Sequence, residues 1–406
     1  MLFRSDTEGL ARAVSHWVRV SANAQSVGAD GAAAVQAARS GPGQIATLIL
    51  PADTAWGEGG VVGARLTPEK RGEVAPETLR NVAQLLRSGQ PTMIILAGDA
   101  LLERGLAAAW RVATATGAKL RTPMQVSRMA RGRGRPPVDR VPYAIDNALK
   151  AFEGIQHVIL VGAKAPMAFF AYPGRPSLLA AAASQTHVLA RPEQDGVHAL
   201  EWLADELGAA KSLQLVENAA KPEIVKGKFE PEAFARTFAA ILPENCIVQE
   251  DAVTSGRALF APTFQAAPND WLQNTGGAIG HGFGCATGAA IASPDRKVIC
   301  LQADGAGMYS LQALWTQARE KLDVVNVVFA NRVYKILHGE LISVGAKPGP
   351  ASNEIFDLAR PALDWQQLAA GMGMESTRVD TLEGFADAFQ AACKRRGPFL
   401  IEFVIA

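Results

Sequence analysis

Two polar residues that could bind a metal ion each follow an apolar, strand-like run in the last part of the chain. Asp304 comes directly after residues 297–303, and Asn331 comes directly after residues 324–330. The two residues are 27 positions apart, which is about the length of a strand–helix–strand crossover. A right-handed crossover brings the ends of both strands to one edge of a parallel sheet. Ligands of open α/β sheets bind at that edge, so we expect the two side chains to lie close together.

The types of these residues predict a site for a hard cation and an anion. Asp304 supplies an anionic oxygen and Asn331 a neutral carbonyl oxygen, and such ligands suit octahedral Mg²⁺. Gly305 and Gly307 allow a turn with exposed N–H groups near a helix N-terminus, which favours phosphate binding. The pattern therefore indicates a metal-bridged diphosphate across two strand ends. On spacing alone, a plain Asp-Gly turn and a plain strand end remain the alternative.

The elements that must position these residues can be read from a C-terminal block, residues 230–406. Its strand candidates are residues 246–249, 297–302, 324–330 and 398–404. Helical patterns separate these runs, and the clearest spans residues 310–322. This alternation is typical of α/β domains with a doubly wound parallel sheet, and we predict that the block binds the metal and the diphosphate.

Two further blocks precede it. Residues 77–213 contain strand candidates at 92–98 and 157–162, with Ala-rich helical stretches between them, and predict a central α/β domain. Residues 1–60 contain a helical stretch and one clear strand at 45–50, which is too little for an independent sheet.

The segments between the blocks, and one basic segment, are predicted to be irregular. Gly-rich and charged residues 57–76 and residues 218–229 have the composition of linkers. The basic segment 128–137 is interpreted as a solvated loop rather than an anion site, because no helix N-cap or ordered glycine pattern follows it.

Composition limits the classes of partner. Lys and Arg total 40 against 39 Asp and Glu, so the net charge of +1 gives no support for a nucleic-acid or membrane-surface partner. No apolar run approaches the roughly 18 residues of a membrane span. The four cysteines show no CxxC spacing. A reducing cytoplasm is therefore the expected location.

The chain resembles the thiamine diphosphate-dependent 2-oxo acid decarboxylases and carboligases, and is similar above all to acetolactate synthase large subunits and benzoylformate decarboxylases. ADGAGMYSLQALWTQA at 303–318, with Asn331, resembles the diphosphate motif of that family. TGGAIGHGFG at 275–284 resembles its preceding Gly-rich segment, and GPFLIEFVIA at 397–406 its last strand. GQIATLILPADTAW at 43–56 resembles the end of the family's first domain.

The resemblance implies a role for individual residues. Asp304 and Asn331 would bind Mg²⁺ through their side chains, and Val333 through its backbone carbonyl. Ile279 would be the apolar wedge that holds the two rings of thiamine diphosphate in a bent conformation, with the amino group near the C2 proton. The other residues that would contact the cofactor are Val253, Thr254, Gly305, Ala306 and Tyr334. His281 and His338 are catalytic candidates, and structural roles remain open for both.

Some positions depart from the family pattern. Ala303-Asp304-Gly305-Ala306 stands where Gly-Asp-Gly-Ser is usual, and Ala330-Asn331-Arg332 stands where Asn-Asn-Gly is usual. Residues 1–60 resemble the C-terminal remnant of the family's pyrimidine-binding domain. In the family, a glutamate of that domain starts proton removal from C2, and we expect that this chain lacks it. Without this glutamate, proton removal from C2 should lose the roughly 10²–10⁴-fold acceleration that a positioned general acid or base contributes. The catalytic group therefore stays unassigned.

The activity that the resemblance implies is thiamine diphosphate- and Mg²⁺-dependent decarboxylation or carboligation of a 2-oxo acid, of the acetolactate synthase type. A benzoylformate-type decarboxylase and a truncated cofactor-binding chain without catalysis are the alternatives. The expected partners are a small-molecule 2-oxo acid and further copies of the chain, in a homodimer or tetramer. Some relatives bind FAD in the central domain, and no clear signature for FAD is visible here.

Overall fold

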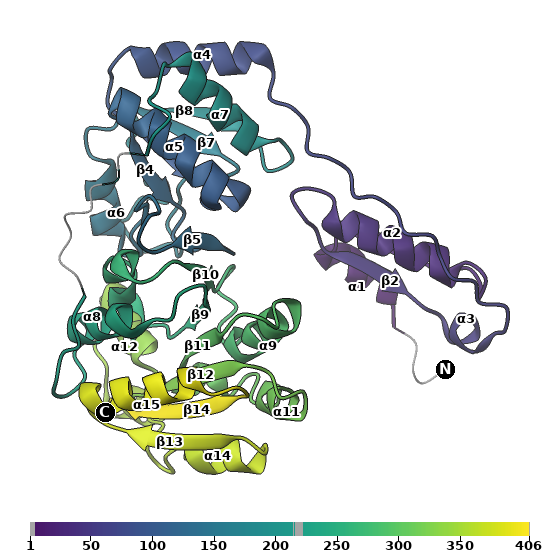
Figure 1. The fold of residues 1–406 in the computed structure, drawn as a ribbon, viewed down its shortest axis with the longest axis vertical. Helices are drawn as coiled ribbons and strands as arrows, with labels where there is room; N and C mark the ends of the chain where they lie inside the picture. Colours follow the sequence, from purple (N-terminus) through teal and green to yellow (C-terminus); the bar gives the residue numbers. More distant parts are fainter. Residues whose placement is uncertain (1–4, 214, 216–221, 406) are drawn as a thin grey trace.

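The computed structural model describes residues 5–213, 215 and 222–405, so part of the predicted linker at 218–229 lies outside the described residues. Three sheets of two, five and seven strands organise the described chain (Figure 1). The strands of these sheets pair in parallel except for one antiparallel pair, β5 with β10. The predicted α/β class with parallel sheets is confirmed.

The seven-stranded sheet carries the edge at which the metal site was predicted. Its order is β13 (Glu375–Val379), β14 (Phe399–Val404), β12 (Val324–Ala330), β11 (Val298–Ala303), β9 (Ile247–Asp251), β10 (Asn269–Gln273) and β5 (Met129–Arg131). The helical elements that follow Ala209 are α8 (Pro231–Ile241), η2 (Arg257–Leu259), η3 (Pro262–Gln265), α9 (Gly282–Ala292), α10 (Asp304–Gly307), α11 (Ala313–Arg319), α12 (Lys335–Ser343), α13 (Pro350–Phe356), α14 (Trp365–Gly371) and α15 (Leu382–Lys394).

Both faces of this sheet are covered, which explains why its central strands are continuous apolar runs. Ile299 and Leu301 of β11 pack toward the phenylalanines of α8 and α15. Val298 and Cys300 point to the opposite face and pack with residues of α9, α11 and α14. Every residue of β11 and β12 is buried, so the two strands form a rigid platform for the loops that follow them.

The basic segment 128–137 was interpreted from the sequence as a solvated loop, and this interpretation is wrong. It contains β5, whose three residues are buried. The guanidinium of Arg131 is 0% exposed and lies 3.8 Å from the ring centroid of Phe260 and 4.1 Å from that of Phe264. It donates to the hydroxyl of Thr263 at 3.0 Å. Aromatic faces stabilise a buried cation, and the local sequence gives no sign of this contact.

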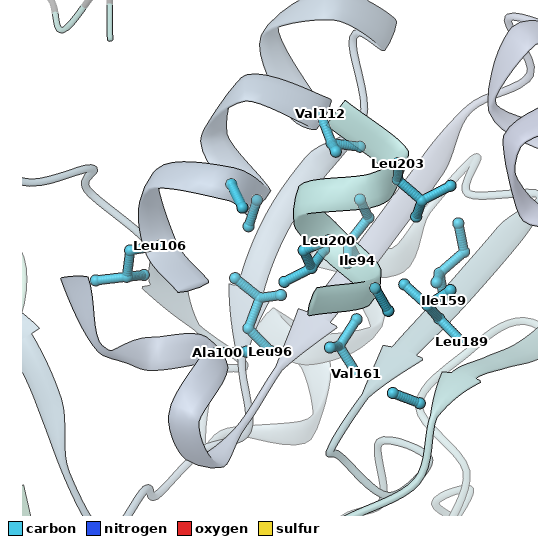
Figure 2. Packing of buried hydrophobic residues seen from close by; sticks show 14 of the residues in the cluster. Ile94, Leu96, Ala100, Leu106, Val112, Ile159, Val161, Leu189, Leu200 and Leu203 are labelled. Atoms are coloured by element: carbon cyan, nitrogen blue, oxygen red, sulfur yellow. The ribbon is translucent and has the colours of Figure 1, made fainter. Parts of the chain in front are cut away.

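The five-stranded sheet forms a central unit. Its order is β6 (Asp139–Arg140), β4 (Lys119–Thr122), β3 (Thr92–Leu96), β7 (His157–Val161) and β8 (Gln185–Ala190). Its helices are α4 (Pro76–Arg87), η1 (Gly98–Leu101), α5 (Glu103–Thr116), α6 (Ile145–Phe152) and α7 (Gly196–Glu206). Figure 2 shows one core of this unit, in which Ile94 and Val161 of the strands face Leu200 and Leu203 of α7.

The N-terminal unit is small and lies apart from the other two units (Figure 1). It consists of α1 (Thr7–Val14), β1 (Trp17–Val20), α2 (Val27–Arg39), β2 (Ala46–Ile49) and α3 (Ala52–Trp56). Sequence analysis identified β2 and missed β1, which pairs with it in parallel. Large apolar side chains are exposed here, such as Trp56 at 85% and Leu10 at 68%. A two-stranded sheet of this kind has little core of its own.

The helices of the described chain include none that is both long enough and apolar enough to cross a membrane.

Two histidines of the central unit make its stability depend on pH. His157 Nδ1 lies 3.1 Å from His187 Nε2. Burial, together with the charge of His157, lowers the pKa of His187. Below about pH 6.5 the unfolded chain therefore binds the proton more readily than the folded chain does, so stability falls as the pH is lowered.

We therefore expect urea to unfold the chain at lower concentration at pH 5.5 than at pH 7.5, and His187→Gln to reduce this difference. Urea titrations at several pH values check the expectation. Equal pH dependence in the wild-type chain and the variant would show that the histidine pair has no such role.

Candidate cofactor and metal site

A cavity of about 300 Å³ lies where β11 and β12 end, and its size falls within the range of small-molecule sites. Each of the nine residues that sequence analysis assigned to the metal or the cofactor lines this cavity. These residues are Val253, Thr254, Ile279, Asp304, Gly305, Ala306, Asn331, Val333 and Tyr334. The structure thus brings together the four segments that follow β9, β10, β11 and β12.

Asp304, one of the predicted metal ligands, joins the loops that follow β11 and β12. β11 and β12 pair in parallel with Ala303 opposite Phe329, so Asp304 and Asn331 leave the sheet at the same edge. Asp304 is 3% exposed. Its Oδ1 accepts from the Gly305 N–H at 2.8 Å, and its Oδ2 accepts from the Arg332 N–H at 2.7 Å. Burial raises the pKa of Asp304, and these backbone hydrogen bonds partly offset the rise.

The donor set fits a hard divalent cation. Asn331 Oδ1 accepts one hydrogen bond, from the Val333 N–H at 3.0 Å, and the Val333 carbonyl accepts one from the Lys335 N–H at 2.8 Å. Each oxygen keeps a lone pair for a metal. One carboxylate and two neutral oxygens suit Mg²⁺, which takes its other ligands from water and phosphate. Among the described residues no group of three or more His, Cys, Asp or Glu could hold a metal.

The two glycines that follow Asp304 have different roles. A Cβ on Gly305 would lie 2.5 Å from Cε1 of Tyr334, so only glycine allows this close approach at the cavity wall. Gly307 does not line the cavity. A Cβ there would lie 2.7 Å from Trp365 and 3.0 Å from Phe283. The absence of a side chain at Gly307 therefore serves the packing of the core, and the predicted phosphate-binding turn stays a prediction.

Val253 in the cavity lining and Arg332, which lies between two lining residues, have strained backbones. Val253 has φ 51° and Arg332 has φ 57°, and a positive φ is a genuine outlier for a β-branched residue such as valine. Strain of this kind persists where the surroundings fix it, often at binding sites. The Nε of Arg332 is buried and has no hydrogen-bond partner within the described chain. Arg332 is not among the residues that line the cavity, and its unpaired Nε departs from the usual pairing of buried polar groups.

Ile279 projects from a turn that a buried carboxylate holds in place. Ile279 is 44% exposed and lines the cavity. Asp251, at the end of β9, is 2% exposed. Its Oδ2 accepts from the Gly280 N–H at 2.7 Å and from Gln302 Nε2 at 2.9 Å. Sequence analysis missed Asp251, although an acidic residue at the end of a buried strand is the same signal that identified Asp304.

The two candidate histidines lie outside the cavity lining. His281 Nε2 is 2.9 Å from Gln249 Nε2, and its Nδ1 is 3.8 Å from Asp251 Oδ2. The ring of His338 packs on Phe356 with 4.9 Å between centroids. These contacts favour the structural roles that sequence analysis left open.

Other lining residues were not singled out from the sequence: Tyr309, Lys335, Ile336 and Leu337. Lys335, Ile336 and Leu337 form the first turn of α12, directly after Tyr334. Continuing the motif by one helical turn beyond Tyr334 would have identified them.

Comparisons with known proteins show which family the chain resembles. Residues 255–403 match the family described as thiamine pyrophosphate enzyme, C-terminal TPP binding domain. Over 403 residues the chain is 44% identical to a Mycobacterium tuberculosis protein provisionally named acetolactate synthase large subunit IlvX, a match that covers 99% of this chain and 77% of the relative. Benzoylformate decarboxylase of Pseudomonas aeruginosa is 28% identical over 178 residues, which is 43% of this chain and 32% of that protein.

A solved structure has the same fold. The thiamine diphosphate-dependent 4-hydroxybenzoylformate decarboxylase of Rhodococcus jostii RHA1 superposes with a TM-score of 0.82 at 22% sequence identity. The superposition covers 99% of this chain and 78% of that one.

Proposed function

The chain belongs to the family of thiamine pyrophosphate (thiamine diphosphate) enzymes, and on that premise we propose that it catalyses the Mg²⁺-dependent decarboxylation and carboligation of a 2-oxo acid. The name of the Mycobacterium tuberculosis relative supports activity of the acetolactate synthase type. The observation that carries the proposal is the cavity at the ends of β11 and β12, because every residue assigned to cofactor or metal lines it.

The roles of the chain's own residues follow from their chemistry. When bound, thiamine diphosphate supplies the electron sink for cleavage of a bond next to a carbonyl. Asp304, Asn331 and the Val333 carbonyl would hold Mg²⁺, which in turn would bind the diphosphate oxygens. The loop of Val253 and Thr254 would contact the diphosphate from its other side.

A benzoylformate-type decarboxylase is the second candidate, because a relative with that name is 28% identical to the chain over 178 residues. The test measures acetolactate from pyruvate and benzaldehyde from benzoylformate, each with thiamine diphosphate and Mg²⁺. We expect acetolactate. Benzaldehyde alone would favour the second candidate, and cofactor binding without either product would point to a binding protein. Failure to bind the cofactor would reject the proposal.

Assembly belongs to the same proposal. We propose that the chain forms a homodimer or tetramer, as the family resemblance implies. Light scattering coupled to gel filtration measures the mass, and a monomer at micromolar concentration would contradict this part.

Replacing the proposed wedge should lower turnover more than cofactor affinity. In Ile279→Ala the cofactor rings would lose the support that holds them bent, and a misplacement of about 1 Å can cost roughly 100-fold in rate. Because Ile279 is partly exposed, folding should be unaffected. Ile279→Leu, which keeps the bulk, serves as the control and should retain most activity. If kcat of Ile279→Ala equals that of the wild-type chain, the wedge role is wrong.

A further inference from the structure

Helix α12 connects the cofactor cavity to the central unit. Lys335, Ile336 and Leu337 in its first turn line the cavity. Glu340, further along the helix, meets two tyrosines of the central unit. The Tyr143 hydroxyl donates to Glu340 Oε1 at 2.6 Å, and the Tyr172 hydroxyl donates to Oε2 at 2.6 Å. Both carboxylate oxygens are therefore engaged, one by each tyrosine.

These hydrogen bonds belong to a strong class. An O–H donor on a carboxylate gives a short bond that is about twice as strong as a neutral one. Burial is the largest cause that raises the pKa of Tyr143, and the hydrogen bond to Glu340 is the next. The same two causes raise the pKa of Tyr172. Both hydroxyls therefore stay protonated and able to donate at neutral pH. The guanidinium of Arg257 lies 5.2 Å from the ring centroid of Tyr143, which further fixes that ring.

Packing alone holds α12 poorly. None of its nine residues is buried, and a helix of this length is marginal without tertiary support. A cleft of about 380 Å³, lined in part by Tyr143, Tyr172 and Glu340, lies beside it. The hydrogen bonds to Glu340 are therefore a major part of what fixes the helix against the rest of the molecule.

The same part of the central unit also supports the turn that carries Ile279. A Cβ on Gly277 would lie 2.9 Å from Cζ of Phe169, so the ring of Phe169 packs directly on this turn. Phe169 is in turn 6.1 Å from the ring of Tyr143 and 4.7 Å from that of Phe170, between centroids. One aromatic group thus contacts two walls of the cavity, the Ile279 turn and α12.

From these contacts we propose that Tyr143 and Tyr172 are positioning residues, which hold α12 against the cofactor cavity through Glu340. This inference rests on the proposed function, since it assigns the tyrosines an effect on cofactor affinity. It makes the shape of the cavity in the C-terminal unit depend on two residues of the central unit.

The test uses the double variant Tyr143→Phe/Tyr172→Phe, which keeps both rings and removes only the hydroxyls. Without cofactor, amide hydrogen exchange in residues 335–343 should rise by roughly 10-fold, since each lost bond involves a charged acceptor. With Mg²⁺, the Kd of thiamine diphosphate should rise by about the same factor, and saturating cofactor should restore kcat. Glu354→Gln on α13, an exposed acid on a neighbouring helix, is the control and should change neither quantity.

The two measurements separate the possible failures. Unchanged exchange in residues 335–343 would overturn the positioning role, whatever the cofactor does. Faster exchange with an unchanged Kd would also overturn it, because α12 would then be tethered without effect on the site. If the wild-type chain does not bind thiamine diphosphate, the proposed function fails, and the positioning role that rests on it is overturned too. The single variant Tyr172→Phe repeats the test with a smaller change to the fold.

Discussion

Asp304→Ala is expected to weaken Mg²⁺-dependent binding of thiamine diphosphate by at least about 100-fold, because it removes the one anionic group among the three proposed protein ligands of the metal. The same substitution removes the acceptor that joins the backbone N–H groups of Gly305 and Arg332. Both the metal and the connection between the two loops are therefore lost together. Isothermal titration with thiamine diphosphate, in the presence and absence of Mg²⁺, measures the effect.

The control is Asp380→Ala, which removes an exposed carboxylate paired with Lys228. Exposed ion pairs of this kind contribute little to stability. The affinity of Asp380→Ala for thiamine diphosphate should therefore equal that of the wild-type chain. A Kd for Asp304→Ala within a few-fold of the wild-type value would refute the assignment of Asp304.

If Asp304 binds the metal as proposed, metal binding should depend on pH. Burial raises its pKa above the ordinary value, so ionisation of this carboxyl opposes folding of the metal-free chain as the pH rises through that range. A metal ligand must be deprotonated. Metal affinity should therefore fall at mildly acidic pH, while the metal-free chain loses no stability from protonation of this group.

Asp251→Ala is expected to lower the free energy of unfolding by about 2–4 kcal/mol and to reduce turnover. The buried donors of Gly280 and Gln302 would lose their acceptor, and each unsatisfied buried group costs about 1–3 kcal/mol. The turn that carries Ile279 would then lose its anchor. Urea unfolding and kcat, measured on the same preparations, check both effects.

Asp251→Asn distinguishes the anchor from general packing, since it keeps the volume and one acceptor oxygen. The free energy of unfolding and the kcat of Asp251→Asn should both lie between those of the wild-type chain and those of Asp251→Ala. If Asp251→Ala unfolds at the wild-type urea concentration, the account of the Ile279 turn is wrong.

The sequence predicted the parts of the fold that depend on local pattern. The run at 324–330 coincides with β12 because its residues are buried on both faces, which leaves an uninterrupted apolar segment. The same property of β11 located Asp304 at its end. The helix predicted at 310–322 is shorter, Ala313–Arg319. The hydroxyl of Ser310 donates to the carbonyl of Gly280, so the first part of that segment links to the Ile279 turn instead.

Contacts between distant segments were not predictable from the sequence. Tyr143 and Glu340 are 197 residues apart, and neither lies in a recognisable motif. The strand β5 was missed because a basic segment is typical of a solvent-exposed loop. The aromatic rings that cover Arg131 come from residues more than a hundred positions later in the sequence. The edge strand β13 has exposed and half-buried residues, so its pattern lacks a continuous apolar run.

A crystal structure with thiamine diphosphate and Mn²⁺ in place of Mg²⁺ tests the central claim most directly, because the anomalous signal of Mn²⁺ locates the metal. We predict one peak at about 2.1 Å from side-chain oxygens of Asp304 and Asn331, the distance typical of a hard cation of this size, with diphosphate oxygens completing the coordination. A peak elsewhere, or bound thiamine diphosphate with no metal between these two side chains, would contradict it.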